Sequence, residues 1–492
     1  MGDSQVQATV PSQGLWAPQT RALTVGLVLT ITFVASEALA VITVMPVAAR
    51  ELGGYSLYGW VFSAFMLGSV VGIVAAGREA DRRGPALPFV AGLVLFGAGL
   101  LTAGLAPSMI VMVAGRALQG AGAGAVPAVA YASIGRSLAG PYRARMMAVL
   151  STAWVAPGLA GPAVAAEVAH AFGWRWVFLG LLPVVAVTGS VAVPALIRLG
   201  PPGARRAEEH RLTDGIRTAA GAALLLSGLT LAAGSRAHPG LHAGAVLAGA
   251  GLIAAGGLVG FPALRRLVPA GTLTSRRGLP ATILSRGLLT FAFFGADAYV
   301  TLSVTTVRDR TPLVASIAVT GATLTWTAGA WVQARLSTKW EGRRLVRTGM
   351  LIVLAGIAGM VTVLQPGVPV AVGIAAWSVA GLGMGLAYSP ISLLMLREAP
   401  PGREGWASAS LNLTDVLGTA IGIGAGGAAV AAVPSLQAGV TVAFAIAAAV
   451  GILGVVLTRY LPPGPASAPA VPGDAAPQDA APEGAAPEDA AA

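Results

Sequence analysis

The chain has 492 residues, of which 55% are hydrophobic and only 10% are charged. A soluble domain carries about 25% charged residues, so this composition excludes an ordinary soluble domain and predicts a polytopic membrane protein. The formal net charge of +11 does not indicate nucleic-acid binding, because the arginines lie in short segments between apolar runs. There is no cysteine and the four histidines are scattered, so we expect no metal site and no cofactor.

Apolar segments of about 20 residues or more, each long enough to cross a bilayer, follow one another along the chain. The pattern predicts fourteen spans, and an even number places both ends of the chain on one side of the membrane. The spans lie near residues 22–47, 57–77, 86–106, 109–134, 146–170, 174–199, 213–233, 242–264, 279–306, 313–337, 344–364, 368–396, 406–433 and 436–459.

The predicted fold is all-α, with two six-helix bundles and two extra helices between them. The predicted regions are a disordered cytoplasmic N-terminus (1–20), an N-terminal six-helix bundle (21–200), two inserted transmembrane helices with cytoplasmic loops (201–270), a C-terminal six-helix bundle (271–460) and a disordered cytoplasmic tail rich in Pro, Ala and acidic residues (461–492). A glycine repeat supports two related halves, since many transporters contain internal repeats with the substrate site between them. Its two copies are Gly120, Gly122 and Gly124 with Pro127, and Gly381, Gly383 and Gly385 with Pro390.

Positive charge is distributed unevenly between the two sides of these spans. Most of the 31 Lys and Arg residues, Arg286 included, are assigned to the side of the termini, and Arg116 lies inside a span. The residues assigned to the opposite side are Arg50, Arg175, Arg236, Arg308 and Arg310. Because cytoplasmic loops carry an excess of Lys and Arg, this asymmetry predicts a cell-membrane protein with both termini in the cytoplasm.

A dense charged segment, Gly77-Arg-Glu-Ala-Asp-Arg-Arg-Gly84, separates the second and third spans. It is predicted to be a loop at one membrane face, because burying charge in hydrocarbon is costly. The spacing G-x-x-x-D-R-x-G resembles the signature loop of the major facilitator superfamily, between its second and third helices. This resemblance implies a cytoplasmic gate in which Asp81 docks at the start of the thirteenth span; the alternative is a solvated loop that only sets topology. The gate residues would be Gly77, Asp81, Arg82, Arg83 and Gly84.

Three further stretches resemble the same superfamily. They are Arg116-Ala-Leu-Gln119-Gly120-Ala-Gly122 in the fourth span, Gly158-Leu-Ala-Gly161-Pro162 in the fifth, and Gly173-Trp-Arg-Trp-Val-Phe at the start of the sixth. Together they resemble the fourteen-helix drug:proton antiporter branch. That resemblance implies alternating access and export of amphipathic drugs, antibiotics or dyes against inward proton flow.

The fifth span is predicted to be a kinked gating helix of the antiporter type, because proline removes a backbone donor and bends a helix. The residues concerned are Pro157, Gly158, Gly161 and Pro162. Ordinary close packing explains the same small residues equally well. The chain departs from the family pattern at Pro157, where a glycine is usual, and the second half lacks the loop aspartate.

Three acidic residues, Glu37, Asp297 and Asp415, fall inside apolar spans and are the proton-coupling candidates. Burial disfavours the charged form of a carboxyl group, which suits a cycle of protonation. Glu37 has two alternatives, an ion pair with Arg116 at similar predicted depth or a position lining a cavity. The alternative for Asp297 is polar packing. For Asp415 a helix cap or an interhelical hydrogen bond is favoured over a transport role.

The leading interpretation is a proton-coupled exporter of amphipathic small molecules that works as a monomer. Its partners would be substrate, protons and the lipid bilayer, without nucleic acid. One alternative is an uptake symporter, but peptide:proton symporters carry E-x-x-E-R in the first span, where this chain has only Glu37. Another is a non-transporting sensor, which normally carries a soluble output domain that is not predicted here. No G-x-x-x-x-G-K-[ST] loop indicates an ATP-driven pump, and no constellation indicates an enzyme.

Overall fold

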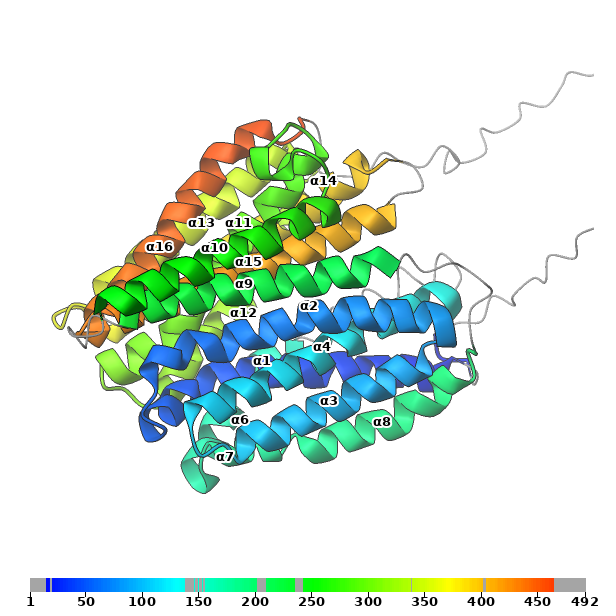
Figure 1. Ribbon diagram of the computed structural model, residues 1–492, viewed down its shortest axis with the longest axis horizontal. Coiled ribbons are helices and arrows are strands. Elements are labelled where there is room, and N and C mark those ends of the chain that lie inside the picture. Colours follow the sequence, from blue (N-terminus) through cyan, green and yellow to red (C-terminus); the bar gives the residue numbers. More distant parts are fainter. Residues whose placement is uncertain are drawn as a thin grey trace, which may run out of the picture.

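The computed structural model describes residues 15–17, 20–137, 146, 149, 153, 155–200, 209–234, 242–337, 339–400 and 404–463. Within these ranges the elements are all helices (Figure 1). Thirteen of them are long and apolar enough to cross a membrane. In lipid every backbone polar group must be satisfied internally, which is why apolar runs of this length form helices. The predicted all-α polytopic fold is confirmed.

The helices follow the predicted spans closely. The first half contains α1 (Arg21–Glu51), η1 (Tyr55–Leu57), α2 (Tyr58–Arg83), α3 (Ala86–Gly104), α4 (Met109–Ser137), α6 (Val155–Phe172), α7 (Arg175–Leu179) and α8 (Leu182–Ile197). The extra helices are α9 (Glu209–Gly234) and α10 (His242–Leu267). The second half contains η4 (Thr272–Thr274), α11 (Leu279–Leu302), η5 (Ser303–Val307), α12 (Pro312–Leu336), α13 (Gly342–Val363), α14 (Val370–Glu398), α15 (Glu404–Ala432), α16 (Leu436–Leu457) and η6 (Thr458–Tyr460).

Four expectations about local structure need correction. The charged segment is mostly not a loop: it forms the last turns of α2, which ends at Gly84 with a φ of 91° that favours glycine. The sixth span breaks into α7 and α8, because Pro183, in the first turn of α8, has no N–H to continue a helix. Order also extends beyond the predicted bundles at both ends, since Leu15 and Leu461 are buried. The rest of the predicted terminal segments, 1–14, 18–19 and 464–492, lies outside the described residues.

The glycine repeat makes equivalent contacts in the two halves. On α4, a Cβ added to Gly120 would lie 2.8 Å from Phe65 Cα of α2, and one on Gly122 would lie 2.5 Å from Phe96 N of α3. The corresponding glycines of α14 repeat this arrangement with the second and third helices of their own half. Gly381 and Gly385 face α12, and Gly383 faces α13. Small residues thus allow the fourth helix of each half to pack closely between two neighbours.

We expect Gly120→Ala to destabilise the protein by about 1–3 kcal/mol, because the new methyl group overpacks the contact between α4 and α2. Gly251→Ala on α10 is the matched control, since a Cβ there meets no described atom within 4 Å and alanine is favoured in helices by about 1 kcal/mol. The measurement is the thermal melting temperature of the purified proteins in one detergent. Equal melting temperatures for the two variants would contradict the packing argument.

The two halves contact each other at the end of the helices opposite the charged segment. Tyr58, the first residue of α2, donates a 3.0 Å hydrogen bond to the Ala298 carbonyl of α11. Near the end of α11, Thr301 Oγ1 donates a 2.9 Å bond to the Ile42 carbonyl of α1. Further along α2, Ser63 Oγ donates a 2.8 Å bond to the Ala420 carbonyl of α15. These hydrogen bonds join helices from the two halves and close this end of the molecule.

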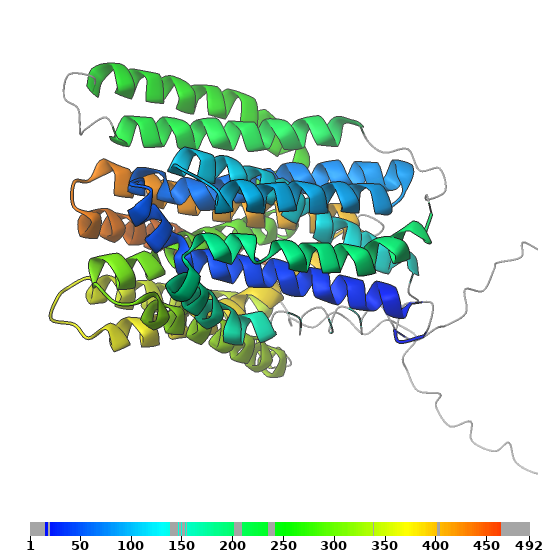
Figure 2. The ribbon, with the colours of Figure 1, turned by 90° about the horizontal axis from the view of Figure 1, so that it is seen from below.

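The extra helices form an outer layer over the boundary between the halves. Figure 1 shows α9 lying along that boundary, between α2 and α15, and Figure 2 shows α9 and α10 along one edge of the bundle. A small apolar cluster joins α9 to α2 of the first half and α15 of the second; its buried members are Leu67, Val70, Ala219, Ala222, Leu226, Leu417 and Ala420. The Trp60 indole on α2 also donates a 3.1 Å bond to Thr230 Oγ1 of α9. The pair α9–α10 is therefore attached to both halves.

Candidate functional site

A buried ion pair connects the first and fourth helices of the first half. Arg116 donates through Nη1 to Glu37 Oε1, and the two side chains are 3% and 0% exposed. Gln119 Nε2 donates a 2.9 Å bond to the same Glu37 oxygen and accepts a 2.7 Å bond from Arg116 through Oε1. The predicted partnership of Glu37 and Arg116 is therefore present in the structure.

The sequence motif of the fourth span explains this geometry. Residues three apart lie on one face of a helix, so Arg116 and Gln119 both reach Glu37. Arg116 Nε also donates a 3.2 Å bond to the Val61 carbonyl, and its guanidinium lies 4.1 Å from the centre of the Phe65 ring. The other oxygen of the carboxylate, Glu37 Oε2, is buried without a hydrogen-bond partner among the described residues.

The second half has an acid in the equivalent place with a different partner. Asp297 on α11, the first helix of its half, is 7% exposed. Its Oδ1 accepts a 2.7 Å hydrogen bond from the indole of the fully buried Trp377 on α14, the fourth helix of that half. Trp377 stands four residues before Gly381, as Arg116 stands four before Gly120. A neutral indole thus replaces the arginine, and no cation of the described chain lies within ion-pair distance of Asp297.

Aromatic rings extend from Asp297 along the inside of the second half. Phe293 stacks on Trp377 with ring centres 5.1 Å apart and meets Trp326 of α12 edge to face at 5.7 Å. Trp326 in turn lies 5.5 Å from Tyr388 of α14. We call Phe293, Phe294, Trp326, Trp377 and Tyr388 the aromatic wall. Phe294, Trp326 and Tyr388 are only partly buried, so part of their surface stays accessible.

A second buried arginine lies at the far end of the aromatic wall. Arg286 of α11 is 2% exposed, and its guanidinium lies 3.4 Å from the centre of the Tyr388 ring. Tyr388 donates a 2.7 Å hydrogen bond from its hydroxyl to Asp415 Oδ2 on α15. An interhelical hydrogen bond of this kind is one of the two structural roles that the sequence favoured for Asp415 over a transport role. The burial of Arg286 was not predicted from the sequence, although the residue falls within the predicted ninth span, which begins at residue 279.

The remaining predicted site residues lie elsewhere. Arg82 and Arg83 stand at the end of α2, where Arg83 pairs with Glu79 at 3.0 Å, but the Asp81 side chain is outside the described residues. The structure therefore does not describe where the Asp81 side chain lies, and its docking at the start of the thirteenth span stays a prediction. In α6, Pro162 is inside the helix, and Pro157 lies close to the start of its described part. Gly158 faces Thr323 of α12, so the fifth helix of the first half contacts the second half there; Gly161 is less crowded.

Residues 25–423 match the sequence model of the Major Facilitator Superfamily. The chain belongs to this superfamily. It is 26% identical over 430 residues to a probable multidrug-efflux transporter of Mycobacterium tuberculosis, covering 84% of this chain and 89% of the relative. It is 32% identical over 176 residues to the multidrug transporter protein MdtP of Bacillus subtilis, covering 36% and 32% of the two chains.

Solved structures of superfamily members have the same fold. The POT family transporter PepTSo superposes with a TM-score of 0.63 over 88% of this chain and 97% of that one, at 14% identity. The xylose transporter XylE of E. coli gives a TM-score of 0.61 over 90% and 98%, also at 14% identity. At these identities the likeness concerns the fold alone. The chain is thus a multi-pass membrane transporter, and the family predicted from its motifs is confirmed.

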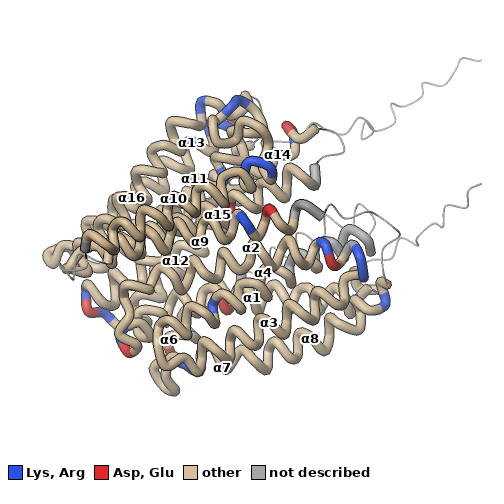
Figure 3. Tube along the Cα trace, in the orientation of Figure 1, with Lys and Arg blue, Asp and Glu red and all other residues tan. Residues whose placement is uncertain are grey.

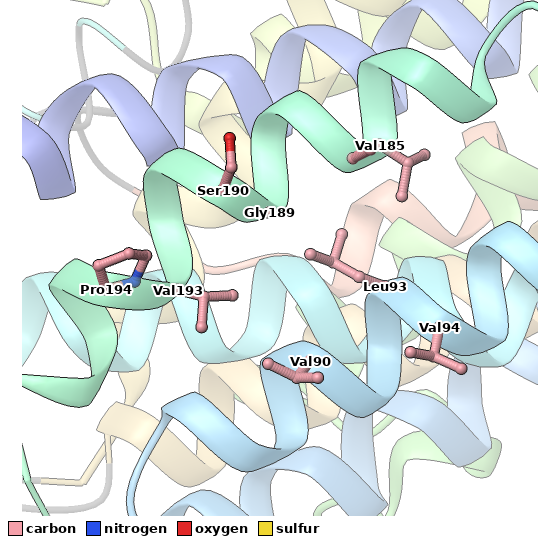
Figure 4. Close-up of a pocket in the computed structure, with 9 residues that line it drawn as sticks. Val90, Leu93, Val94, Val185, Gly189, Ser190, Val193 and Pro194 are labelled. Carbon is pink, nitrogen blue, oxygen red and sulfur yellow. The ribbon is translucent and has the colours of Figure 1, made fainter.

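An open groove of about 460 Å³ lies on this transporter between α3 and α8. Figure 4 shows its lining residues on the two neighbouring helices. They are Val90, Leu93, Val94, Val185, Ala186, Gly189, Ser190, Val193 and Pro194. Val94 is 65% exposed. In a membrane protein such an apolar outer surface faces lipid chains, so the groove is not the candidate substrate site.

Proposed function

We propose that this transporter exports amphipathic small molecules from the cytoplasm and that inward proton flow drives export by alternating access. The observation that carries the proposal is the aromatic wall with the acid Asp297 at one end. Aromatic faces bind apolar and planar parts of many ligands, while a few placed polar groups fix orientation. The names of the two multidrug relatives support the same substrate class.

Asp297 is the proton site in this proposal. Protonation of Glu37 would break its bond with Arg116 and leave a buried guanidinium with one partner fewer. Among the described residues Asp297 accepts a hydrogen bond from Trp377 alone, so its carboxyl group can take up and lose a proton without breaking an ion pair. Glu37 and Arg116 then hold α1 against α4, so that the first half moves as one body.

The contacts between the halves support alternating access. The hydrogen bonds of Tyr58 and Thr301 lie at one end, where α2 begins and α11 ends, so transport requires them to break while the opposite end closes. Lys and Arg positions gather mainly toward the other end of the helices, with a smaller group at this one (Figure 3). Because positive charge marks the cytoplasmic side, we assign the closed end to the outside and both termini to the cytoplasm.

The test is accumulation of ethidium and susceptibility to a drug panel in a pump-deficient bacterial host. Cells that express the transporter should accumulate less dye and tolerate at least one drug better, and a protonophore should abolish both effects. An uptake symporter would instead increase accumulation of its substrate. No difference from the empty host over the whole panel, or export that survives the protonophore, would contradict the proposal.

We expect Trp326→Ala to weaken drug binding by up to about tenfold, because one well-placed aromatic contact contributes about 0.5–1.5 kcal/mol beyond its buried area. Trp331→Ala is the control, since Trp331 stands on the same helix and is 67% exposed. The readout is the concentration of drug that gives half-maximal efflux in vesicles. If both variants behaved like the wild type, the aromatic wall would not contact substrate.

A further inference from the structure

The two buried arginines of this protein differ in how completely their donors are satisfied. Arg116 bonds through Nε to a carbonyl and through Nη1 to a carboxylate and an amide. Arg286 has a single hydrogen-bond partner in the part of the chain that the structure describes, Ser392 Oγ, to which it donates through Nη2. Its Nε and Nη1 are buried and have no hydrogen-bond partner among the described residues.

Leaving such a guanidinium without hydrogen-bond partners is energetically unfavourable. A buried donor on a charged group is destabilising when its hydrogen bond is not made. The face of Tyr388 attracts the cation but does not accept these in-plane N–H bonds. Asp415 does not satisfy them either, because no carboxylate of the described chain lies within 4 Å of a guanidinium nitrogen of Arg286, and Asp415 Oδ2 accepts from Tyr388 instead.

The side chains around Arg286 are partly accessible, and one of them, Asp415, carries a carboxyl group. Tyr388, Ser392 and Asp415, which stand on α14 and α15 around it, are each only partly buried. The wall leads from this point through Tyr388, Trp326 and Phe293 to Trp377, so a ligand can place a ring on the wall and a charged group at its end. Arginine presents adjacent N–H groups in a planar fork that matches a carboxylate in bidentate geometry.

We propose that Arg286 is the binding site for the carboxylate of an amphipathic substrate whose apolar part lies on the aromatic wall. The inference rests on the proposed export function and extends it, since it adds anionic and zwitterionic amphiphiles to the substrates. Nε and Nη1 donate to the two carboxylate oxygens, and Tyr388 and Trp326 contact the adjoining ring.

The test is direct binding of dansylglycine and of its uncharged methyl ester to the purified full chain in phosphatidylcholine nanodiscs. Energy transfer from tryptophan to the dansyl group reports binding. Wild-type protein should bind the acid at least tenfold more tightly than the ester. Arg286→Gln should remove that preference and leave ester binding unchanged. Arg347→Gln, which removes one exposed positive charge from α13, should bind both probes like the wild type.

Two further measurements could reject the proposal. Arg286→Lys, for use if the glutamine variant does not fold, keeps the charge but loses the fork and should bind the acid several-fold more weakly than the wild type. Acid binding that disappears in discs containing phosphatidylglycerol would assign the site to a lipid headgroup and overturn the substrate assignment. Equal binding of acid and ester by the wild type would also overturn it.

The outcomes separate this proposal from the proposed function. Normal ethidium efflux together with charge-insensitive dansyl binding would reject the carboxylate site alone. Absence of efflux in the host, together with acid binding that depends on Arg286, would reject export and keep the site.

Discussion

Asp297→Asn should abolish efflux driven by a pH gradient while the protein still inserts, folds and binds drug. Asparagine keeps the size of the side chain and can still accept the 2.7 Å hydrogen bond from Trp377, but it cannot carry a proton. The measurement is drug transport by membrane vesicles with an imposed pH gradient, compared with drug exchange in the absence of a gradient. Gradient-driven transport should fall to the rate of empty vesicles, and exchange should persist.

The control for this variant is Asp309→Asn, the same chemical change at an exposed position just beyond η5. Asp309 has a φ of 49°, a conformation that asparagine also adopts readily. The Asp309→Asn variant should therefore transport like the wild type. Gradient-driven efflux at normal rates in Asp297→Asn would move the coupling role to Glu37 or Asp415.

Arg116→Ala should be the most destabilising single change in the first half. Removing one partner of a buried ion pair costs about 3–5 kcal/mol, because the remaining charge is left uncompensated. Here that charge is Glu37, which is 0% exposed. Arg116→Lys keeps the charge but loses the fork that reaches both Val61 and Glu37, so we expect an intermediate loss. Thermal melting of the purified variants and their level in the membrane are the measurements.

Two comparisons test whether the loss of stability depends on the burial of the ion pair. The double variant Glu37→Gln with Arg116→Met removes both charges and should recover much of the lost stability, because a buried pair can often be replaced by neutral groups. Arg175→Ala removes an exposed pair with Glu51 and should cost about 1 kcal/mol or less. If Arg116→Ala and Arg175→Ala melted alike, the Glu37 pair would not have the importance that its burial indicates.

Much of the architecture followed from local sequence. The apolar runs predicted the helices within a few residues, because a segment in lipid must satisfy its own backbone and has no other way to do so. The glycine triplets around Gly122 and Gly383 predicted two related halves, and the structure places them in equivalent contacts. The motif containing Arg116 and Gln119 predicted the family. Each of these features depends on hydrophobicity or on the spacing of residues within a helix, and both can be read directly from the sequence.

Three features of the structure were not predicted from the sequence. Arg286 was assigned to the side of the termini, but the sequence did not show that residues of α14 enclose its side chain. The sixth span was predicted as one helix, but it breaks before Pro183. Glu37 and Asp297 looked alike as lone acids in apolar spans, and nothing nearby in sequence distinguishes their environments.

The sequence by itself thus determined the membrane-spanning helices, the repeat and the superfamily, because each depends on hydrophobicity and on spacing within a helix. Only the tertiary structure decided which acid is neutralised, since that depends on the rotation of each helix about its axis and on the residue that the fourth helix of each half presents. Arg116 faces Glu37, whereas Trp377 faces Asp297. Coulomb attraction fixes the first carboxylate in an ion pair, whereas the second accepts a hydrogen bond from a neutral donor, which is why we propose Asp297 as the proton site.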